Sequence, residues 1–315
     1  MIAFIVFNPD GSYNERIARA VEAHGCEAAL FSWKNFDYKL VAQFDPAKDK
    51  ILFRTGAPQA IPIARAFEGA GFRVINDSRY IQLSGHKYLA NVHARASGIT
   101  IPDLNVVIPK GNVELLSLYL KQNGPLVAKP IMSRDKGRFV FLVKSEADFA
   151  DVATIPGSSI LLQSEVKFER LVRTIVTRDR MLVEATTYDT KHDSWKATVC
   201  ENPRAKYYEN VPKELVETAK KTIRVFGGHI AYIDYFQTTR GFVLNEINHS
   251  CGLIEHERIS GFPIADELGS YLAGFPGNPR RSGSNASIGS SSRVSSVTAK
   301  KYPATFRRSS RSFRV

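Results

Sequence analysis

Short apolar runs separated by helical patterns occupy the first part of the chain. Ile2–Phe7, Ile51–Phe53 and Phe72–Ile75 are apolar runs of strand length, and a helical pattern covers residues 60–70. Strands that alternate with helices favour a parallel sheet with crossover connections. The pattern therefore predicts a small α/β domain over residues 1–76.

The next part, residues 77–160, has a shorter and more mixed pattern. A helical segment at 86–98 ends at Gly98, a residue that favours a helix C-terminus. Strand-like runs and helical patterns then alternate at 104–108, 112–122, 126–129, 139–143 and 145–153. This alternation predicts a small central α/β unit.

A third part, residues 161–275, is predicted to open with the buried strand Ile160–Gln163. Strands at 171–177 and 180–188, a helix at 212–226, a hairpin at 229–248 and a helix at 263–273 follow it. The chain as a whole is therefore expected to be α/β, and α+β in parts.

The net charge of +12 first suggests a nucleic-acid partner, but its location changes this interpretation. Residues 276–315 hold nine Lys and Arg and no acid, so residues 1–275 carry 34 basic and 31 acidic side chains, a balance of +3. The tail is rich in Ser, Gly and Arg and has too few large apolar residues to fold alone. It is expected to be disordered in isolation. It either binds an anionic partner, docks a protein substrate, or only increases solubility.

Cysteine use and the N-terminus indicate the compartment. Cys26, Cys200 and Cys251 are too widely spaced for a disulfide framework or a zinc pattern. The N-terminal apolar run stops after seven residues, which is typical of a first strand and not of a signal peptide or membrane span. A cytoplasmic protein without a membrane segment is expected.

The most informative stretch is the hairpin, whose strands flank the turn Thr238–Gly241. Side chains alternate between the two faces of a strand. One face is thus predicted to carry Ile230, Tyr232, Asp234, Phe236, Phe242, Leu244, Glu246 and Asn248. With the turn centred near Arg240, Asp234 lies opposite Glu246.

Opposed carboxylates repel each other, and burying them unpaired is costly. A hard divalent cation relieves both costs, and Mg²⁺ typically uses one or two carboxylates together with phosphate oxygens. Asp234, Glu246 and Asn248 are therefore candidate metal ligands. The alternative is a solvated sheet face on which each acid pairs with a lysine or an arginine.

Two lysines extend the hypothesis to an anion. Lys129 ends an otherwise apolar strand, and Lys87 begins a helix after a turn. A lysine on a buried strand either reaches solvent at the edge or meets an anion, and phosphate suits its compact ammonium group. Considered alone, each lysine is more often a surface residue. The two lysines therefore support an anion site only in combination with the hairpin. The polar exit Gln163–Val166 fits an adenine-binding segment or an ordinary loop equally well.

These residues resemble the ATP-grasp superfamily, in particular the RimK-like amino-acid ligases. The resemblance covers roughly residues 1–273 and is most specific at Asp234 followed by Glu246-Ile-Asn248-His-Ser-Cys-Gly-Leu253. It implies an N-terminal pre-ATP-grasp domain and two lobes that clasp ATP. It also implies Mg²⁺, as two ions with Mn²⁺ as a substitute, at Asp234, Glu246 and Asn248. The positions that it assigns to ATP are Lys87, Lys129, Gln163, Ser164, Glu165 and Val166.

The resemblance also implies a mechanism. A carboxylate attacks the γ-phosphate of ATP, and an amine then displaces phosphate from the acylphosphate to form an amide. Arg173 matches an arginine that contacts phosphate or a substrate carboxylate, and it is the predicted catalytic residue. Amino-acid, peptide or protein carboxylates and amines are the implied substrates, and a thiol acceptor is a further alternative. A homo-oligomer remains compatible with the sequence.

The chain departs from the family pattern in two loops. The phosphate-covering loop, Met132–Arg138, has one glycine. Either its basic side chains Lys136 and Arg138 replace backbone amides as phosphate ligands, or the loop no longer binds ATP. The second outcome would leave a binding or structural protein that acts through its basic tail. The substrate loop matches only loosely, and its candidate substrate contacts are Lys196, Arg204, Lys206 and Ser250. Cys251 is expected to line the site and not to act as a nucleophile.

Overall fold

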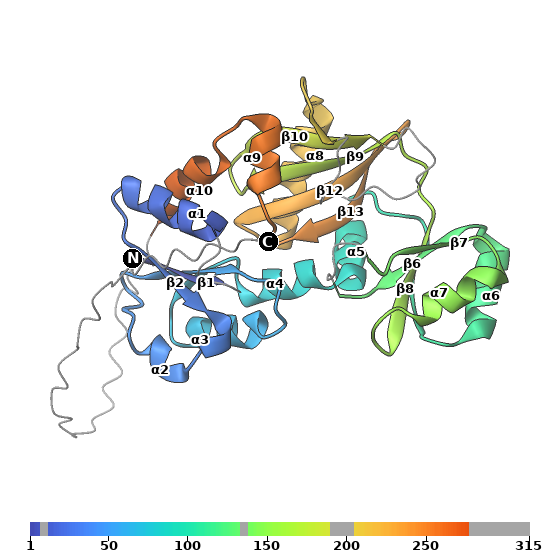
Figure 1. Cartoon of the computed structure of the whole chain (residues 1–315), viewed down its shortest axis with the longest axis horizontal. Helices are drawn as coiled ribbons and strands as arrows, with labels where there is room; N and C mark the ends of the chain where they lie inside the picture. The colour runs from blue at the N-terminus through green and yellow to red at the C-terminus, as the bar shows by residue number, and fades with distance from the viewer. Residues whose placement is uncertain (7–11, 133–137, 190–204, 277–315) are drawn as a thin grey trace, which may run out of the picture. The chain divides into compact units, whose positions relative to one another are not determined.

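The computed structural model describes residues 1–6, 12–132, 138–189 and 205–276, which belong to one compact unit, Met1–Asn278. Lys136, Lys196 and Arg204 lie outside these residues, as does the basic tail from residue 277. The described strands form three sheets (Figure 1).

The first sheet is parallel, as the alternation of strands and helices predicted. Its strand order is β2 (Ala28–Ser32), β1 (Ile2–Val6), β3 (Lys50–Arg54), β4 (Arg73–Ile75). Its helices are α1 (Ser12–Ala23), the 3₁₀ turn η1 (Trp33–Asn35), α2 (Tyr38–Val41) and α3 (Ala60–Gly69). The pattern did not reveal β2, an edge strand that is only half-buried along its length and whose apolar run, Ala28–Phe31, is short.

The second sheet is antiparallel, with the order β5 (Asn105–Pro109), β8 (Ser159–Ser164), β6 (Leu126–Pro130), β7 (Phe141–Val143). The 3₁₀ turn η3 (Glu146–Asp148) and the helices α6 (Val113–Asn123) and α7 (Phe149–Ala153) accompany it. The run Ile160–Gln163 was expected to open the third part of the chain. It lies in β8, between β5 and β6, so a boundary at residues 160 and 161 would cut a central strand of this sheet.

The third sheet has the order β11 (Ala205–Tyr207), β10 (Met181–Asp189), β9 (Arg170–Thr177), β12 (Ile230–Thr238), β13 (Gly241–Asn248). Helix α8 (Lys213–Phe226) covers one face, where Leu215, Ile223 and Phe226 pack on Ile233 and Tyr235. The remaining helices are α4 (Ser78–Gly85), α5 (Lys87–Ala96), α9 (Ile254–Ser260) and α10 (Ile264–Ala273).

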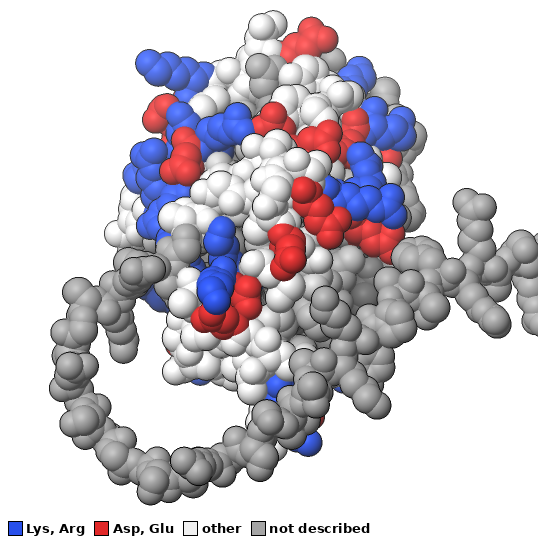
Figure 2. Space-filling model, turned by 90° about the vertical axis from the view of Figure 1, so that its left-hand side faces the viewer, with Lys and Arg blue, Asp and Glu red and all other residues white. Residues whose placement is uncertain are grey.

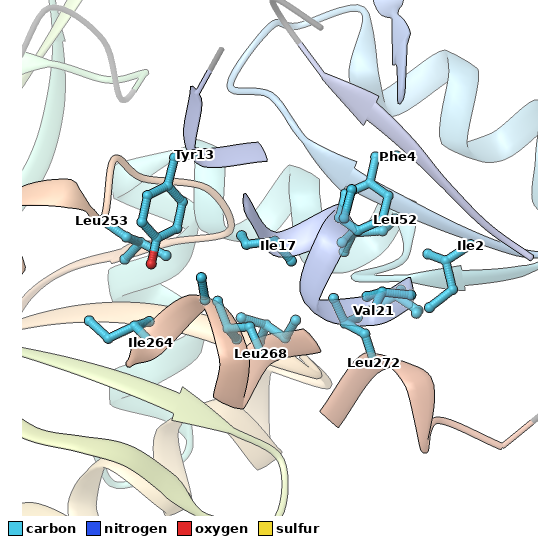
Figure 3. Close-up of a cluster of buried hydrophobic side chains, with 14 of the residues drawn as sticks. Ile2, Phe4, Tyr13, Ile17, Val21, Leu52, Leu253, Ile264, Leu268 and Leu272 are labelled. Carbon is cyan, nitrogen blue, oxygen red and sulfur yellow. The ribbon is translucent and has the colours of Figure 1, made fainter. Parts of the chain in front are cut away.

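The opposite face of the third sheet shares a hydrophobic core with the first sheet. This core brings β1 and α1 together with β12 and α10 (Figure 3). Phe4 and Ile17 pack there with Tyr232, Leu253 and Leu268, all of which are almost completely buried. Burying apolar side chains of both sheets in one cluster fixes the carboxyl ends of β1 and β3 near the face of β12 that carries Asp234.

A β-bulge in the hairpin changes part of the predicted face. Asp234 pairs with Glu246, but the next pair is Tyr235 with Leu244, so Asn245 is an extra residue on β13. Phe242 and Leu244 therefore pack under α8 with Tyr235, on the face opposite Glu246. Their predicted placement beside Glu246 was wrong, because strict alternation cannot anticipate an inserted residue.

Charges of both signs are interspersed on the surface shown in Figure 2, in agreement with the small net charge of the first 275 residues. No helix among the described residues is long and apolar enough to cross a bilayer.

Helices α1 and α10 cross at Gly269. A Cβ atom added there would lie 2.4 Å from the Cβ of Ala20 and 2.7 Å from its backbone carbon. We expect Gly269→Ala to lower the free energy of unfolding by about 1–3 kcal/mol, because this contact cannot relax without moving the helix backbone. Chemical denaturation measures the change.

The matched control is Gly69→Ala in α3, where an added Cβ meets nothing within 4 Å. It should be neutral or stabilising by up to about 1 kcal/mol, since alanine favours a helix over glycine. Equal losses in both variants would contradict the close helix crossing.

Candidate active site

Three charged side chains form a row across neighbouring strands of the third sheet. In the strand register, Asp234 of β12 lies opposite Arg173 of β9 on one side and opposite Glu246 of β13 on the other. Asn248 lies opposite Tyr232, one side-chain step further along the same face. The predicted juxtaposition of Asp234, Glu246 and Asn248 is thus confirmed as geometry.

Arg173 and Asp234 form a buried bidentate ion pair. The Arg173 Nε and Nη2 atoms donate to the two Asp234 carboxylate oxygens at 2.5 and 2.6 Å. The Asp234 side chain is 4% exposed and that of Arg173 is 10% exposed. Burial raises the pKa of the Asp234 carboxyl, and the guanidinium offsets part of that rise.

The second carboxylate is paired with a lysine from the helix α5. The Lys87 Nζ lies 3.1 Å from Glu246 Oε1. Lys87 is the first residue of α5, and its backbone N–H donates to the carbonyl of Ile131, just after β6, at 2.8 Å. This bond joins the start of α5 to the second sheet, which is why the two predicted lysines converge although 42 residues separate Lys87 from Lys129 in the sequence.

Lys129 enters the same site from β6. Leu126 and Ala128 of β6 face the core of the second sheet. Because side chains alternate between the two faces of a strand, Lys129 points to the opposite face. It is 4% exposed, and its Nζ lies 3.5 Å from Asn245 Oδ1. Burial, reinforced by the charge of Lys87, lowers the pKa of Lys129 to about 7. The lysine thus does not reach solvent, and an anion beside it would restore its charge.

The oxygen donors fit a hard divalent cation. Asp234 and Glu246 supply carboxylates and Asn248 supplies an amide oxygen on one face, a set that Mg²⁺ accepts together with phosphate oxygens. Among the described residues, no three His, Cys, Asp or Glu side chains form a metal-binding group. A metal at this face would therefore rely on the amide and on ligand oxygens as well as on the two carboxylates.

The predicted adenine segment begins with the last two residues of β8, Gln163 and Ser164, and its polar side chains are partly engaged. The Gln163 Nε2 donates to Asn105 Oδ1 at 2.9 Å, and Asn91 Nδ2 donates to the same oxygen at 2.9 Å. Ser164 Oγ accepts from the backbone of Leu104. The Gln163 side chain thus joins β8 to β5, and Asn105 joins both to Asn91 of α5.

Glu165 and Val166 follow at the strand exit. Glu165 pairs with Lys167 at 2.7 Å, and Val166 is partly exposed. Other predicted residues are dispersed. Arg138 is exposed and lies over the ring of Phe139, Lys206 is exposed on β11, and Ser250 is half-buried two residues after the end of β13.

Three residues with a place in this arrangement were not predicted. Asn245 joins the site through the bulge, and Asn105 orients Gln163. His249 is buried, with Nε2 at 2.8 Å from the Thr55 carbonyl and Nδ1 at 3.0 Å from Ser84 Oγ. Because a carbonyl only accepts, Nε2 carries the proton, and burial lowers the pKa of this histidine, which keeps it neutral. The polar run that contains Asn245 and His249 was visible in sequence, but their contacts depend on the tertiary structure.

Comparison with known proteins places this geometry in context. A family model described as the RimK-like ATP-grasp domain matches residues 84–272. A glutamate–LysW ligase, ArgX, of Sulfurisphaera tokodaii is 26% identical over 219 residues, which cover 67% of this chain and 74% of that protein. A probable alpha-L-glutamate ligase of Legionella pneumophila is 24% identical over 295 residues, covering 86% and 94%.

A solved structure shares the fold. The ATP-grasp ligase PsnB, complexed with a phosphomimetic variant of a minimal precursor, Mg and ADP, has a TM-score of 0.65 at 15% identity. The alignment covers 86% of this chain and 97% of that one. This likeness confirms the fold class predicted from the sequence.

Lys129 gives a prediction for stability and pH. The folded pKa of about 7 lies below the reference value of 10.5, so between these values the unfolded chain holds more protons and stability rises with pH. Below about pH 7 the full cost of burying the charge is present. We expect Lys129→Met to raise the free energy of unfolding by about 1–3 kcal/mol near pH 7, and by less as the pH approaches 10.

Chemical denaturation across this pH range measures the difference between wild type and variant. The control is Lys121→Met, which removes an exposed lysine from α6. A difference for Lys129→Met that stays constant with pH, as in the control, would show that the buried ammonium is not the cause.

Proposed function

Because the chain belongs to the RimK-like ATP-grasp family of carbon–nitrogen ligases, we propose that it joins a carboxylate to the amine of an amino acid through an acylphosphate. ATP and Mg²⁺ would bind between the second and third sheets. The observation that carries the proposal is the convergence of two buried lysines and an arginine on the Asp234–Glu246 pair.

The arrangement suits phosphoryl transfer because it can accept both a metal and several negative oxygens. Lys87, Lys129 and Arg173 supply three cations around one face of the third sheet. None of the three side chains is exposed to solvent. Charges that are fixed before the reaction stabilise developing charge without reorganisation of the site. Phosphoryl transfer depends mainly on such positioning and electrostatic stabilisation.

The proposed reaction has two steps that balance. A carboxylate oxygen of the first substrate bonds to the γ-phosphorus of ATP while the bond to the ADP oxygen breaks. The nitrogen of the second substrate then bonds to the acyl carbon, phosphate leaves, and the amine gives its proton to solvent or to the leaving phosphate. Neither step requires a covalent bond to the protein, so Cys251 is not assigned a nucleophilic role.

The chain's own residues have distinct tasks in this scheme. Asp234, Glu246 and Asn248 would hold Mg²⁺, which would supply positive charge to offset the negative charge of the phosphate groups. Lys87 and Arg173 pair with the two carboxylates, and both would contact phosphate oxygens of ATP. Lys129 contributes a point charge from β6, and its neighbour Asn245 orients the ammonium.

The names of the relatives support an amino-acid substrate. Two of them are named for ligation of glutamate, one onto LysW and one as an alpha-L-glutamate ligase. We therefore propose glutamate as the first amine substrate to test, with peptides and proteins as candidate carboxylate substrates.

The test measures ADP release with Mg²⁺ and ATP in the presence of glutamate and candidate peptide carboxylates. It also measures the increase in mass of the peptide to which glutamate is joined. We expect Asp234→Asn and Glu246→Gln each to lower turnover roughly 100-fold or more, since each replaces a carboxylate by a neutral amide and so removes the negative charge that would hold the metal.

The matched control is Glu217→Gln, which changes an exposed glutamate of α8 on the other face of the same sheet. It should retain wild-type turnover. ADP release that survives in both site variants, or an absence of turnover with every acceptor, would reject the ligase proposal.

A further inference from the structure

Arg54 is a buried cation with only neutral partners. It ends β3 and is 8% exposed. Its Nε donates to Asn14 Oδ1 at 2.8 Å, its Nη1 to the Tyr232 hydroxyl at 2.6 Å, and its Nη2 to the Cys251 carbonyl at 3.0 Å. Within the described part of the chain, Arg54 has no carboxylate partner.

No carboxylate among the described residues compensates the charge of Arg54. Asn14 lies in the first turn of α1, so the guanidinium sits beside a helix N-terminus, which carries partial positive charge. Glu257 shares the neighbour Tyr13 with Arg54, but it is bound to Arg16 at 2.5 Å and to the backbone of Ala265. A buried charge without a counterion is costly, and a bound anion would remove that cost.

The guanidinium retains the donors that an anion needs. Arginine has five N–H groups, and the three hydrogen bonds use the Nε group and one on each terminal nitrogen. One N–H on Nη1 and one on Nη2 therefore have no acceptor among the described residues. Two guanidinium N–H groups are the number of donors that a carboxylate with two oxygens accepts from an arginine.

The topology of the first sheet independently indicates a ligand at this position. The strand order β2-β1-β3-β4 reverses the direction of its connections between β1 and β3. In open α/β sheets, ligands bind outside the carboxyl ends of the strands at such a switch point. Arg54 is the last residue of β3, at that carboxyl end.

The position is rigid and close to the row of charges. The backbone carbonyl of Thr55, next to Arg54, accepts from His249, which follows Asn248 in the chain. Tyr232, which binds Arg54, lies opposite Asn248 and two residues before Asp234 on β12. Two residues of a strand span about 7 Å, a length that a small substrate with two functional groups can bridge.

We propose that Arg54 binds a carboxylate of an amino-acid substrate, namely one that is not activated in the reaction. The inference rests on the proposed ligase function and adds to it the class of substrate: an amino acid that keeps a free carboxylate at the switch point while its other group reacts beside Asp234. Arg54 acts as a specificity residue for that carboxylate and makes no contact with ATP.

The test is calorimetric titration of the full chain, with Mg²⁺ and a non-hydrolysable ATP analogue, by L-glutamate, L-aspartate, glutamine and isoglutamine. The two amides each replace one carboxylate of glutamate. We expect wild type to lose roughly tenfold or more in affinity with one of the amides, because its fork of N–H groups then faces a neutral group. Arg54→Met should bind the acid and that amide equally, with nucleotide affinity within about twofold of wild type.

The matched control is Arg73→Met, which removes another arginine of the first sheet. Arg73 begins β4, at the end of the sheet opposite to Arg54, and donates to the Pro276 carbonyl. The control variant should discriminate between acid and amide as wild type does. Arg54→Lys keeps the charge without the fork and serves if Arg54→Met does not fold; it should show a reduced preference for the acid.

Several outcomes would overturn the inference. One is that the wild type binds none of the carboxylates. Another is that Arg54→Met still binds the acid more tightly than the amide. A third is that Arg54→Met loses affinity equally for acid and amide, which would indicate a structural role. Carboxylate binding that depends on Arg54, without ADP release in the separate turnover test, would support this site while the ligase proposal failed.

Discussion

Two carboxylates on adjacent strands can share a buried face only if cations compensate them. Asp234 and Glu246 lie directly opposite each other, and their compensation comes from different elements: Arg173 from the neighbouring strand β9 and Lys87 from the start of α5. The charge balance therefore links the second sheet to the third. Since Lys87 is bonded through its backbone to the end of β6, the same requirement also brings Lys129 to the site.

Packing on the other flank determines which part of the first sheet meets this face. The core around Phe4, Ile17 and Leu268 joins α1 to α10, and the small size of Gly269 permits the close approach of these helices. That contact brings the carboxyl end of β3 to Tyr232 and the segment after β13. Apolar burial thus sets the position, while the polar bonds of Arg54 and His249 set the orientation. The hydrophobic contacts supply most of the free energy, and the buried polar groups are costly unless all of them are bonded.

Period and spacing predicted much of this arrangement because it follows from local rules. The alternation of strands and helices predicted the parallel first sheet. A turn centred near Arg240 predicted Asp234 opposite Glu246; the observed turn pairs Thr238 with Gly241, and the bulge at Asn245 shifts the register so that Glu246 lies opposite Asp234. The exceptions have two causes. The bulge at Asn245 breaks the strict alternation within its hairpin. The insertion of β8 between β5 and β6 and the contacts of His249 depend on residues far away in the sequence. Local patterns carry no information about such partners, and Lys136, Lys196 and Arg204 lie outside the described residues.

The charges around the site also explain why it should require an anion. Among the described residues, Lys87, Lys129 and Arg173 surround the two carboxylates of Asp234 and Glu246, and Arg54 has no carboxylate partner, so full ionisation would leave an excess of positive charge in a region of low solvent access. The protein limits this excess by lowering the pKa of Lys129 to about 7, and burial is the main cause. A nucleotide near Lys129 and a carboxylate near Arg54 would each remove part of the remaining cost. Binding and stability are then linked, because any ligand that binds only the folded chain stabilises it. A site that is electrostatically incomplete by itself selects for anionic ligands and rejects neutral analogues of the same shape.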